Sequence, residues 1–216
     1  MSPSSHWPIV VLASGRGSNL QALHEASQFH GLPIRIAGVI SDKADCGAIV
    51  YAREQGIPCQ TFSSKDYTSR EAFDLALMQA VSAYQPKLIV CAGYMRIISE
   101  AGLNAAPCPM INIHPSLLPR YTGLHTHARA IADGRHEHGA SVHLVNSVLD
   151  GGRVLSQAKV AVLAEDSAQS LAERVLNREH PLLIETVRAL IDGRLFLQQN
   201  ASARVVWLQD DNSTLE

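Results

Sequence analysis

A continuous apolar run, Ile9-Val-Val-Leu-Ala13, ends in a glycine turn and is followed by a segment of helical composition. A run without polar alternation predicts a strand buried on both faces, as in parallel sheets. The turn Gly15-Arg-Gly-Ser-Asn19 then leads into Leu20-Gln-Ala-Leu-His-Glu-Ala26. At such a helix start, backbone N–H groups and the positive end of the helix dipole point outward together. The segment therefore predicts an anion site.

The same turn also has a purely structural interpretation. In that alternative the glycines only make a tight connection, and Ser18 and Asn19 cap the helix. The dinucleotide fingerprint G-x-G-x-x-G is incomplete, because Leu20 occupies the third glycine position. This departure argues against NAD and favours a mononucleotide phosphate.

Further strand-like and helix-like segments alternate along the chain. Predicted strands cover residues 34–40, 59–62, 88–92, 111–114, 140–145 and 154–162, with terminal strands within 194–208. Predicted helices cover residues 48–55, 70–84 with Ser69 as cap, and 128–133. A last helix follows residue 166, with a kink or restart near His180 because of Pro181. We expect one α/β domain over residues 1–216, with residues 1–8 and 209–216 as flexible ends. Its sheet is expected to be open, twisted and mainly parallel, with about seven strands, helices on both faces and an antiparallel addition toward the C-terminus.

Composition and charge exclude several classes of partner. Of 216 residues, 46% are hydrophobic and 18% charged, and the net charge of -2 leaves no basic excess for nucleic acid. No apolar run approaches the roughly 20 residues of a membrane span, and residues 1–8 lack the features of a signal peptide. We therefore expect a cytoplasmic protein.

Cysteine and histidine spacing does not indicate a metal centre. The four cysteines show no C-x-x-C pair, so neither a disulfide scaffold nor a zinc site is expected. His125 with His127, and His136 with His138, are spaced as metal ligands can be, but no acidic or cysteine cluster accompanies them. We expect these histidines to form hydrogen bonds within the site instead.

The segment Met110-Ile-Asn-Ile-His114 places an amide and an imidazole two residues apart, so Asn112 and His114 should share one face of a strand. Pro115 and Pro119 end the strand and stiffen the turn that follows. Asp150, beside Gly151 and Gly152, is the carboxylate that could hold His114 protonated and oriented. In the alternative reading, His114 is a structural histidine and Asp150 only begins a turn.

Two other connections have unusual composition. Gly93-Tyr-Met-Arg-Ile-Ile98 is an apolar loop with one arginine, and it either walls a pocket for a flat ligand or is ordinary core with Arg96 reaching solvent. Asp42 follows the second predicted strand, where an acid could bind a ribose or lie in a solvated turn, and we favour the turn.

Several motifs occur in order and at compatible spacing. They are Ala13-Ser-Gly-Arg-Gly-Ser-Asn-Leu-Gln21, Ala92-Gly-Tyr-Met-Arg-Ile97, Asn112-Ile-His-Pro-Ser-Leu-Leu-Pro119, Gly123-Leu-His-Thr-His127, His138-Gly-Ala-Ser-Val-His143, Leu149-Asp-Gly-Gly152 and Arg178-Glu-His180. Together they resemble the phosphoribosylglycinamide formyltransferase family, from about residue 9 to about residue 197. That family transfers a formyl group from 10-formyltetrahydrofolate to the amine of glycinamide ribonucleotide in purine biosynthesis, and it uses no metal.

The resemblance implies roles residue by residue. The matching positions are Asn112, His114 and Asp150 for catalysis; Gly17, Ser18 and Asn19 for phosphate; Glu179 for the ribonucleotide; and Met95, Arg96, Ile97, Ile98, Val145 and Asn146 for folate. Asn112 and protonated His114 would stabilise a tetrahedral oxyanion, while Asp150 raises the pKa of His114 and relays the amine proton. The expected partners are these two small molecules, with a homodimer possible.

Four positions depart from the family pattern. Thr122 and Arg153 stand where proline is usual, Leu176 replaces a frequent polar or basic phosphate contact, and Pro181 directly follows His180. We therefore expect the catalytic residues to match the family more closely than the substrate loops do.

Other functions can be built on the same core. The chain could be a formyltetrahydrofolate hydrolase, a formyltransferase acting on aminoacyl-tRNA, or a non-catalytic nucleotide-binding module. The hydrolases add an N-terminal regulatory domain and the tRNA enzymes a basic C-terminal domain, and we expect neither extension here.

Overall fold

The computed structural model describes residues 6–197 and 206–208. The chain divides into two compact units, Met1–Asn112 and Ile113–Glu216. Eight strands are formed within the described residues, against about seven expected. The expected ends 1–5 and 209–216 lie outside the described residues.

The first unit is built on parallel strands in the order β3-β2-β1-β4-β5. Their bounds are β1 (Trp7–Leu12), β2 (Ile34–Ser41), β3 (Cys59–Thr61), β4 (Leu88–Cys91) and β5 (Met110–His114), the last of which continues into the second unit. Residues 9–12 are fully buried, which confirms the prediction from the apolar run. Because the strands themselves are buried, polar side chains that could bind a ligand lie in the loops that follow β1, β2 and β4, at the carboxyl edge of this sheet.

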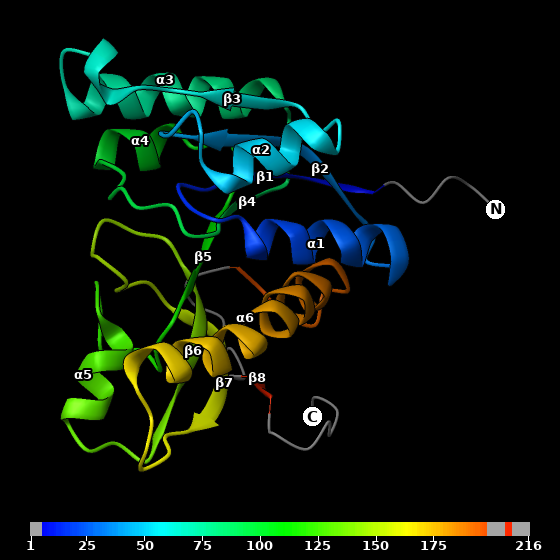
Figure 1. The fold of residues 1–216 in the computed structure, drawn as a ribbon. Coiled ribbons are helices and arrows are strands. Elements are labelled where there is room, and N and C mark those ends of the chain that lie inside the picture. The colour runs from blue at the N-terminus through cyan, green and yellow to red at the C-terminus, as the bar shows by residue number, and fades with distance from the viewer. Residues whose placement is uncertain (1–5, 198–205, 209–216) are drawn as a thin grey trace. The chain divides into compact units, whose positions relative to one another are not determined.

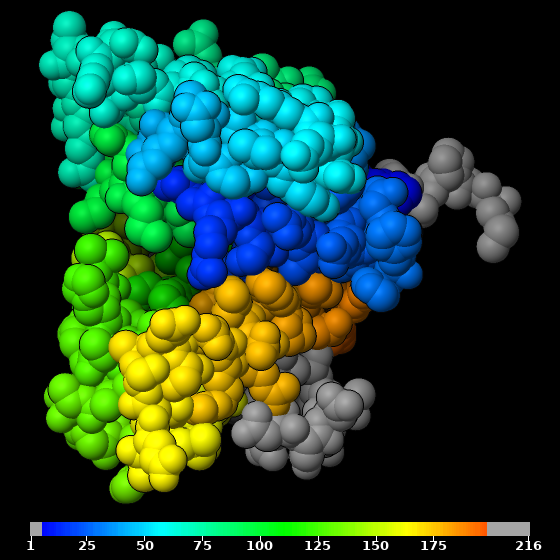
Figure 2. Space-filling view, in the orientation of Figure 1, coloured from blue at the N-terminus to red at the C-terminus, as the bar shows by residue number. Residues whose placement is uncertain are grey.

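Helices α1 (Ser18–Phe29), α2 (Gly47–Glu54), α3 (Arg70–Ala83) and α4 (Glu100–Ala105), with the 3-10 turn η1 (Ser64–Asp66), connect these strands. Figure 1 shows β1 and β2 between α1 and α3, and the outer sides of α1 and α2 form surface in Figure 2. On α3, Phe73, Leu77 and Val81 are fully buried and the Ser69 hydroxyl accepts the Ala72 N–H at 3.1 Å, both as predicted. The short helix α4 was not predicted from the sequence.

The start of β1 corrects the expected N-terminal boundary. Trp7 and Pro8 belong to the strand and not to a flexible end. The backbone N–H of Trp7 donates to the Pro33 carbonyl at 2.8 Å, and the Lys87 ammonium lies 5.5 Å from the Trp7 ring centroid. Pairing with β2 and this cation–π contact therefore hold a segment that has no strong strand signal in its sequence.

The second unit contains β6 (Glu137–Leu144) and β7 (Val154–Ala161), which pair antiparallel, and β8 (Val206–Leu208), which pairs parallel with β7. The predicted antiparallel addition and a terminal strand within 194–208 are confirmed. Helix α5 (Thr126–Ala132) contacts α6 (Ala168–Ile191), which packs on β6 and β7.

Of the kink or restart predicted near His180, the restart is wrong. Helix α6 runs without interruption through Pro181. Pro181 is exposed, and so is Asn177, whose carbonyl would have accepted the missing N–H bond. Water can satisfy a carbonyl on an exposed face, so the helix tolerates the proline there.

In the part of the chain that the structure describes, no helix is long and apolar enough to cross a membrane.

Two histidines form a mostly buried pair in the second unit. The ring nitrogens His138 Nε2 and His127 Nδ1 lie 3.2 Å apart, so these two histidines form a hydrogen bond with each other. Burial, followed by the neighbouring His127, lowers the pKa of His138 to about 4, and burial also lowers the pKa of His127. The folded state therefore favours the neutral imidazoles.

This pair predicts a loss of stability in mild acid. As the pH falls from 6.5 toward 4 the unfolded chain takes up a proton that folded His138 resists, so the free energy of unfolding decreases, by up to about 3 kcal/mol. His138→Gln should make the free energy of unfolding less dependent on pH between 7 and 4.5, measured by urea denaturation. His136→Gln, at an exposed histidine, should leave that dependence unchanged. A parental pH dependence in His138→Gln would contradict this assignment.

Candidate active site

Strand β5 carries Asn112 and His114 at alternate positions, so both belong to the same face of the strand, as predicted. The imidazole of His114 is buried, with the residue 6% exposed. Its Nε2 lies 2.9 Å from the carbonyl oxygen of Tyr121. Because a carbonyl can only accept, Nε2 carries the proton of the neutral ring and Nδ1 has its lone pair free for another proton.

The turn after β5 is fixed by buried polar side chains of the neighbouring strands. The Ser141 hydroxyl donates to the Ser116 carbonyl at 2.6 Å and accepts the Leu118 N–H at 3.0 Å. The Gln157 amide donates to the Leu118 carbonyl at 3.0 Å and to the Ser141 hydroxyl at 2.8 Å. The rigid strand end that the two prolines predicted is thus tied to β6 and β7.

The carboxylate of Asp150 lies between two imidazoles. Its Oδ2 is 3.5 Å from Nδ1 of His114, as the sequence led us to expect, and its Oδ1 is 3.6 Å from Nε2 of His143. The Gly123 N–H donates to Oδ2 at 2.8 Å. Asp150 has φ 50°, a left-handed conformation that is uncommon outside glycine but that aspartate adopts more often than most residues. The Gly151 N–H closes the bend on the Val148 carbonyl at 3.0 Å.

His143 was not predicted as a member of this cluster. It is buried on β6, and its Nδ1 lies 2.8 Å from the Leu144 carbonyl, so this nitrogen donates and Nε2 faces Asp150. The sequence contains only a weak indication that His143 lies near Asp150. His143 shares a strand face with Ser141 and precedes Asp150 by seven residues, and neither feature distinguishes it from a packed strand histidine.

The charge state of His114 differs from the prediction. Burial lowers the pKa of His114, and this effect outweighs the Tyr121 carbonyl and Asp150, which raise it. The expected protonated imidazole is therefore wrong for the free protein, because desolvation disfavours the cation more than the carboxylate favours it.

The Asp150 carboxyl shifts toward its charged form. Burial raises its pKa, but the neighbouring His143, the hydrogen bond from the Gly123 N–H and the neighbouring His114 bring the pKa below the ordinary value. At neutral pH the cluster consequently holds an ionised carboxylate beside a neutral His114 imidazole. The ionised Asp150 carboxylate can accept a proton from a reacting group in this largely buried site.

The predicted anion turn lies in the first unit. Gly17 has φ 84° and is the N-cap of α1, with no side-chain hydrogen bond, so capping by Ser18 and Asn19 is not what the structure shows. A Cβ at Gly17 would lie 2.7 Å from the Ala48 Cα. Glycine is therefore required at this position both by backbone conformation and by close approach.

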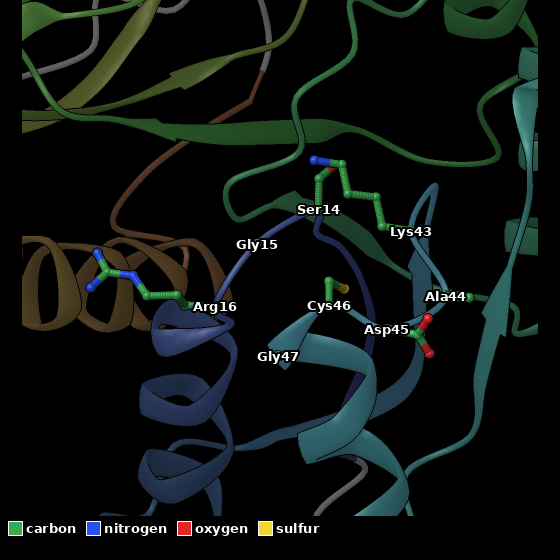
Figure 3. Close-up of a pocket in the computed structure, with 8 residues that line it drawn as sticks. All are labelled: Ser14, Gly15, Arg16, Lys43, Ala44, Asp45, Cys46 and Gly47. Atoms are coloured by element: carbon green, nitrogen blue, oxygen red, sulfur yellow. The ribbon is translucent and has the colours of Figure 1, made fainter.

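A cavity of about 560 Å³ opens beside this turn. It is lined by Ser14, Gly15, Arg16, Lys43, Ala44, Asp45, Cys46 and Gly47, and Figure 3 shows the Lys43 side chain reaching toward Ser14 while Arg16 and Asp45 point away on opposite sides.

Asp42, expected in a solvated turn, is partly buried at the end of β2. It accepts the Ser14 hydroxyl at 2.6 Å, and the same hydroxyl oxygen accepts the Met95 N–H at 3.0 Å. The solvated-turn prediction is wrong because this carboxylate connects the ends of β1 and β2 to the loop after β4.

The predicted folate residues of the loop after β4 are presented unequally. Met95 and Ile97 are 64% and 49% exposed, whereas Ile98 is buried. The Arg96 guanidinium carbon lies 4.5 Å from the centroid of the Phe73 ring. The loop therefore displays apolar side chains to solvent, while its arginine stacks on α3 instead of extending into water.

The remaining predicted residues belong to the second unit. Val145 and Asn146 follow β6, and the Asn146 side chain accepts the Val148 N–H at 3.0 Å, which shapes the loop leading to Asp150. Glu179 lies half-buried on α6, one turn after Leu176, a position that differs from the family pattern. At Arg153, which also differs from that pattern, the guanidinium donates to the Phe196 carbonyl. Within residues 6–197 and 206–208, no group of three or more histidine, cysteine or acidic residues is arranged to hold a metal ion.

Comparison with known proteins places this chain among formyl transferases. The Formyl transferase family model matches residues 8–187. The phosphoribosylglycinamide formyltransferase of Escherichia coli (strain K12) is 44% identical over 194 residues, covering 90% of this chain and 92% of that protein. The protein of the same name from Mycobacterium tuberculosis (strain ATCC 25618 / H37Rv) is 40% identical over 188 residues, covering 87% and 86%.

Solved structures agree with this relationship. The phosphoribosylglycinamide formyltransferase of Coxiella burnetii is 42% identical with a TM-score of 0.85, covering 90% of this chain and 92% of that chain. Glycinamide ribonucleotide transformylase 1 of Symbiobacterium toebii is 38% identical with a TM-score of 0.86, covering 91% and 92%. The fold is thus the Rossmann-like formyltransferase fold, as expected, and the chain belongs to the formyl transferase family.

Proposed function

We propose that this protein transfers the formyl group of 10-formyltetrahydrofolate to the amine of 5-phosphoribosylglycinamide, a step of purine biosynthesis. Relatives named for this activity match nearly the whole chain at 40% to 44% identity. The observation that carries the proposal is the buried Asp150 carboxylate with an imidazole on each side. Formyl transfer to an amine needs an acceptor for the amine proton, and this carboxylate supplies one.

The reaction begins when the neutral amine attacks the formyl carbon. A C–N bond forms, the carbonyl electron pair moves to oxygen, and the nitrogen becomes positively charged. The oxyanion needs donors already in place, and the Asn112 amide is one. His114 is the second once its neutral ring has taken up a proton from water at Nδ1, a charged form that the neighbouring Asp150 favours. It then donates from Nδ1 while Nε2 remains bonded to the Tyr121 carbonyl, and it keeps both protons through the step.

Asp150 moves the proton. Its carboxylate accepts a proton from the charged amine nitrogen and delivers it to the folate nitrogen as the old C–N bond breaks. The products are a formamide and tetrahydrofolate, and the carboxylate is regenerated without a covalent enzyme intermediate. The lowered pKa of Asp150 keeps its carboxylate ionised at neutral pH, so the charged amine nitrogen, a stronger acid than a neutral amine, can transfer a proton to it.

Binding roles follow from the family match and from local geometry. Gly17, Ser18 and Asn19 are proposed to hold the substrate phosphate at the start of α1, where N–H groups have no intrahelical acceptor. Glu179 is proposed to bind the ribonucleotide. The folate contacts are assigned to Met95, Arg96, Ile97, Ile98, Val145 and Asn146. A homodimer and a cytoplasmic location stay predictions.

One assay separates the proposed transferase from a hydrolase, and both of these from a protein that is inactive with these two substrates. Folate absorbance is followed after mixing the protein with 10-formyltetrahydrofolate, with and without phosphoribosylglycinamide. The proposed function requires release of tetrahydrofolate that depends on the ribonucleotide. Release without it would indicate hydrolysis, and no release with either mixture would contradict the proposal.

The catalytic roles predict large losses on substitution. His114→Ala and Asp150→Asn should each lower kcat by about a hundredfold or more, because each removes a group that acts in the transition state. Ribonucleotide binding, measured by calorimetry, should persist because the phosphate turn is unchanged. Near-parental turnover in both variants would remove the assignment.

The phosphate turn predicts a second, distinct loss. Gly17→Ala should raise the KM for the ribonucleotide, because a methyl group 2.7 Å from the Ala48 Cα displaces the turn. Gly31→Ala is the matched control, since Gly31 also has positive φ but no atom within 4 Å of its added Cβ. A ribonucleotide KM in Gly17→Ala equal to that of the control would argue against a phosphate site here.

A further inference from the structure

The segment from Tyr121 to His125 supplies backbone groups to both ionisable residues of the proposed site. The Tyr121 carbonyl accepts from His114 Nε2 at 2.9 Å. The Gly123 N–H donates to Asp150 Oδ2 at 2.8 Å. The position of this backbone therefore sets which nitrogen of His114 is protonated and which way the carboxylate faces.

This backbone has an uncommon conformation. Tyr121 has φ 57° and His125 has φ 58°, with Gly123 at 74° between them. Non-glycine residues adopt left-handed φ only where surrounding contacts impose it. The segment consequently needs side chains outside it to hold its peptide planes.

Arg129 on α5 makes such contacts. Its Nη1 donates to the Thr122 carbonyl at 2.7 Å and lies 3.5 Å from the Leu124 carbonyl. Its guanidinium carbon lies 5.3 Å from the centroid of the Tyr121 ring. One side chain thus holds the carbonyls on both sides of Gly123 and the ring that precedes them.

The Thr122 carbonyl and the Gly123 N–H belong to the same peptide group. A cation therefore binds the oxygen of this peptide while its hydrogen binds a carboxylate, in the order Arg129, peptide, Asp150. Hydrogen bonds in such a chain polarise and strengthen one another. Any rotation of this peptide plane moves the N–H away from Asp150.

We propose that Arg129 is a positioning residue for formyl transfer, acting on Asp150 through the Thr122–Gly123 peptide and on His114 through the Tyr121 carbonyl. The proposal rests on the catalytic roles assigned above. Arg129 is exposed, so its hydrogen bonds contribute little to the stability of the fold, while its effect on the geometry around Asp150 is direct.

The first test compares Arg129→Ala and Arg129→Lys with Arg135→Gln. Arg135 is the matched control, because it binds the Tyr121 hydroxyl at 3.0 Å at the side-chain end. Arg129→Ala should lower kcat by about ten- to a hundredfold, with KM for both substrates changing by less than about threefold. Arg129→Lys should lower kcat less than Arg129→Ala does, and millimolar guanidinium should restore part of the lost kcat in Arg129→Ala. The kcat of Arg135→Gln should stay near that of the parent protein. The melting temperatures should agree within a few degrees.

The second test is a double-mutant cycle with Asp150→Asn, followed together with the amide proton shift of Gly123 by NMR. If Arg129 acts through Asp150, Arg129→Ala should cost little further kcat in the Asp150→Asn background, and it should move the Gly123 amide signal upfield in the parental background. Additive losses, an unmoved Gly123 signal, or equal losses in Arg129→Ala and Arg135→Gln would overturn the proposal. Full activity of Asp150→Asn alone would instead overturn the catalytic role of Asp150.

Discussion

The carboxylate of Asp150 is largely buried, and it lies between two imidazoles and accepts a hydrogen bond from a backbone N–H. Removing a carboxylate from water is costly, and the fold offsets this cost with a hydrogen bond from the Gly123 N–H and with the neighbouring imidazoles of His143 and His114. The same burial leaves Asp150 and His114 in different charge states. The pKa of Asp150 falls and the acid stays charged, whereas burial lowers the pKa of His114 and favours its neutral form.

This arrangement explains several features of the second unit that would otherwise be unrelated. Asp150 occupies a left-handed conformation, and a Cβ at Gly152 would lie 1.7 Å from the Leu144 carbonyl, so the bend needs a glycine there. The turn after β5 is buttressed by Ser141 and Gln157. Each of these features fixes the direction from which a carboxylate or an imidazole is presented, which is what a preorganised site requires.

Much of this could be predicted from the sequence, and the failures have physical causes. The buried run at residues 9–12 and the cap at Ser69 follow from local patterns that the fold leaves intact. The continuity of α6 through Pro181 depends on which face of the helix is exposed, which single-residue rules do not contain. The charge of His114 was mispredicted because the sequence shows only that an imidazole and a carboxylate are available to pair. The free-energy cost of removing both charges from water depends on how deeply the fold buries them.

We infer that His114 is neutral in the free protein, with its proton on Nε2, and that Asp150 still favours the cation. A pH titration of ¹⁵N-labelled histidines by NMR, with His114 assigned from a His114→Gln variant, measures both properties. We expect a His114 pKa below 6.5, an Nε2–H tautomer at neutral pH, and a further decrease of that pKa in Asp150→Asn. A pKa above 6.5, or one that Asp150→Asn leaves unchanged, would contradict it.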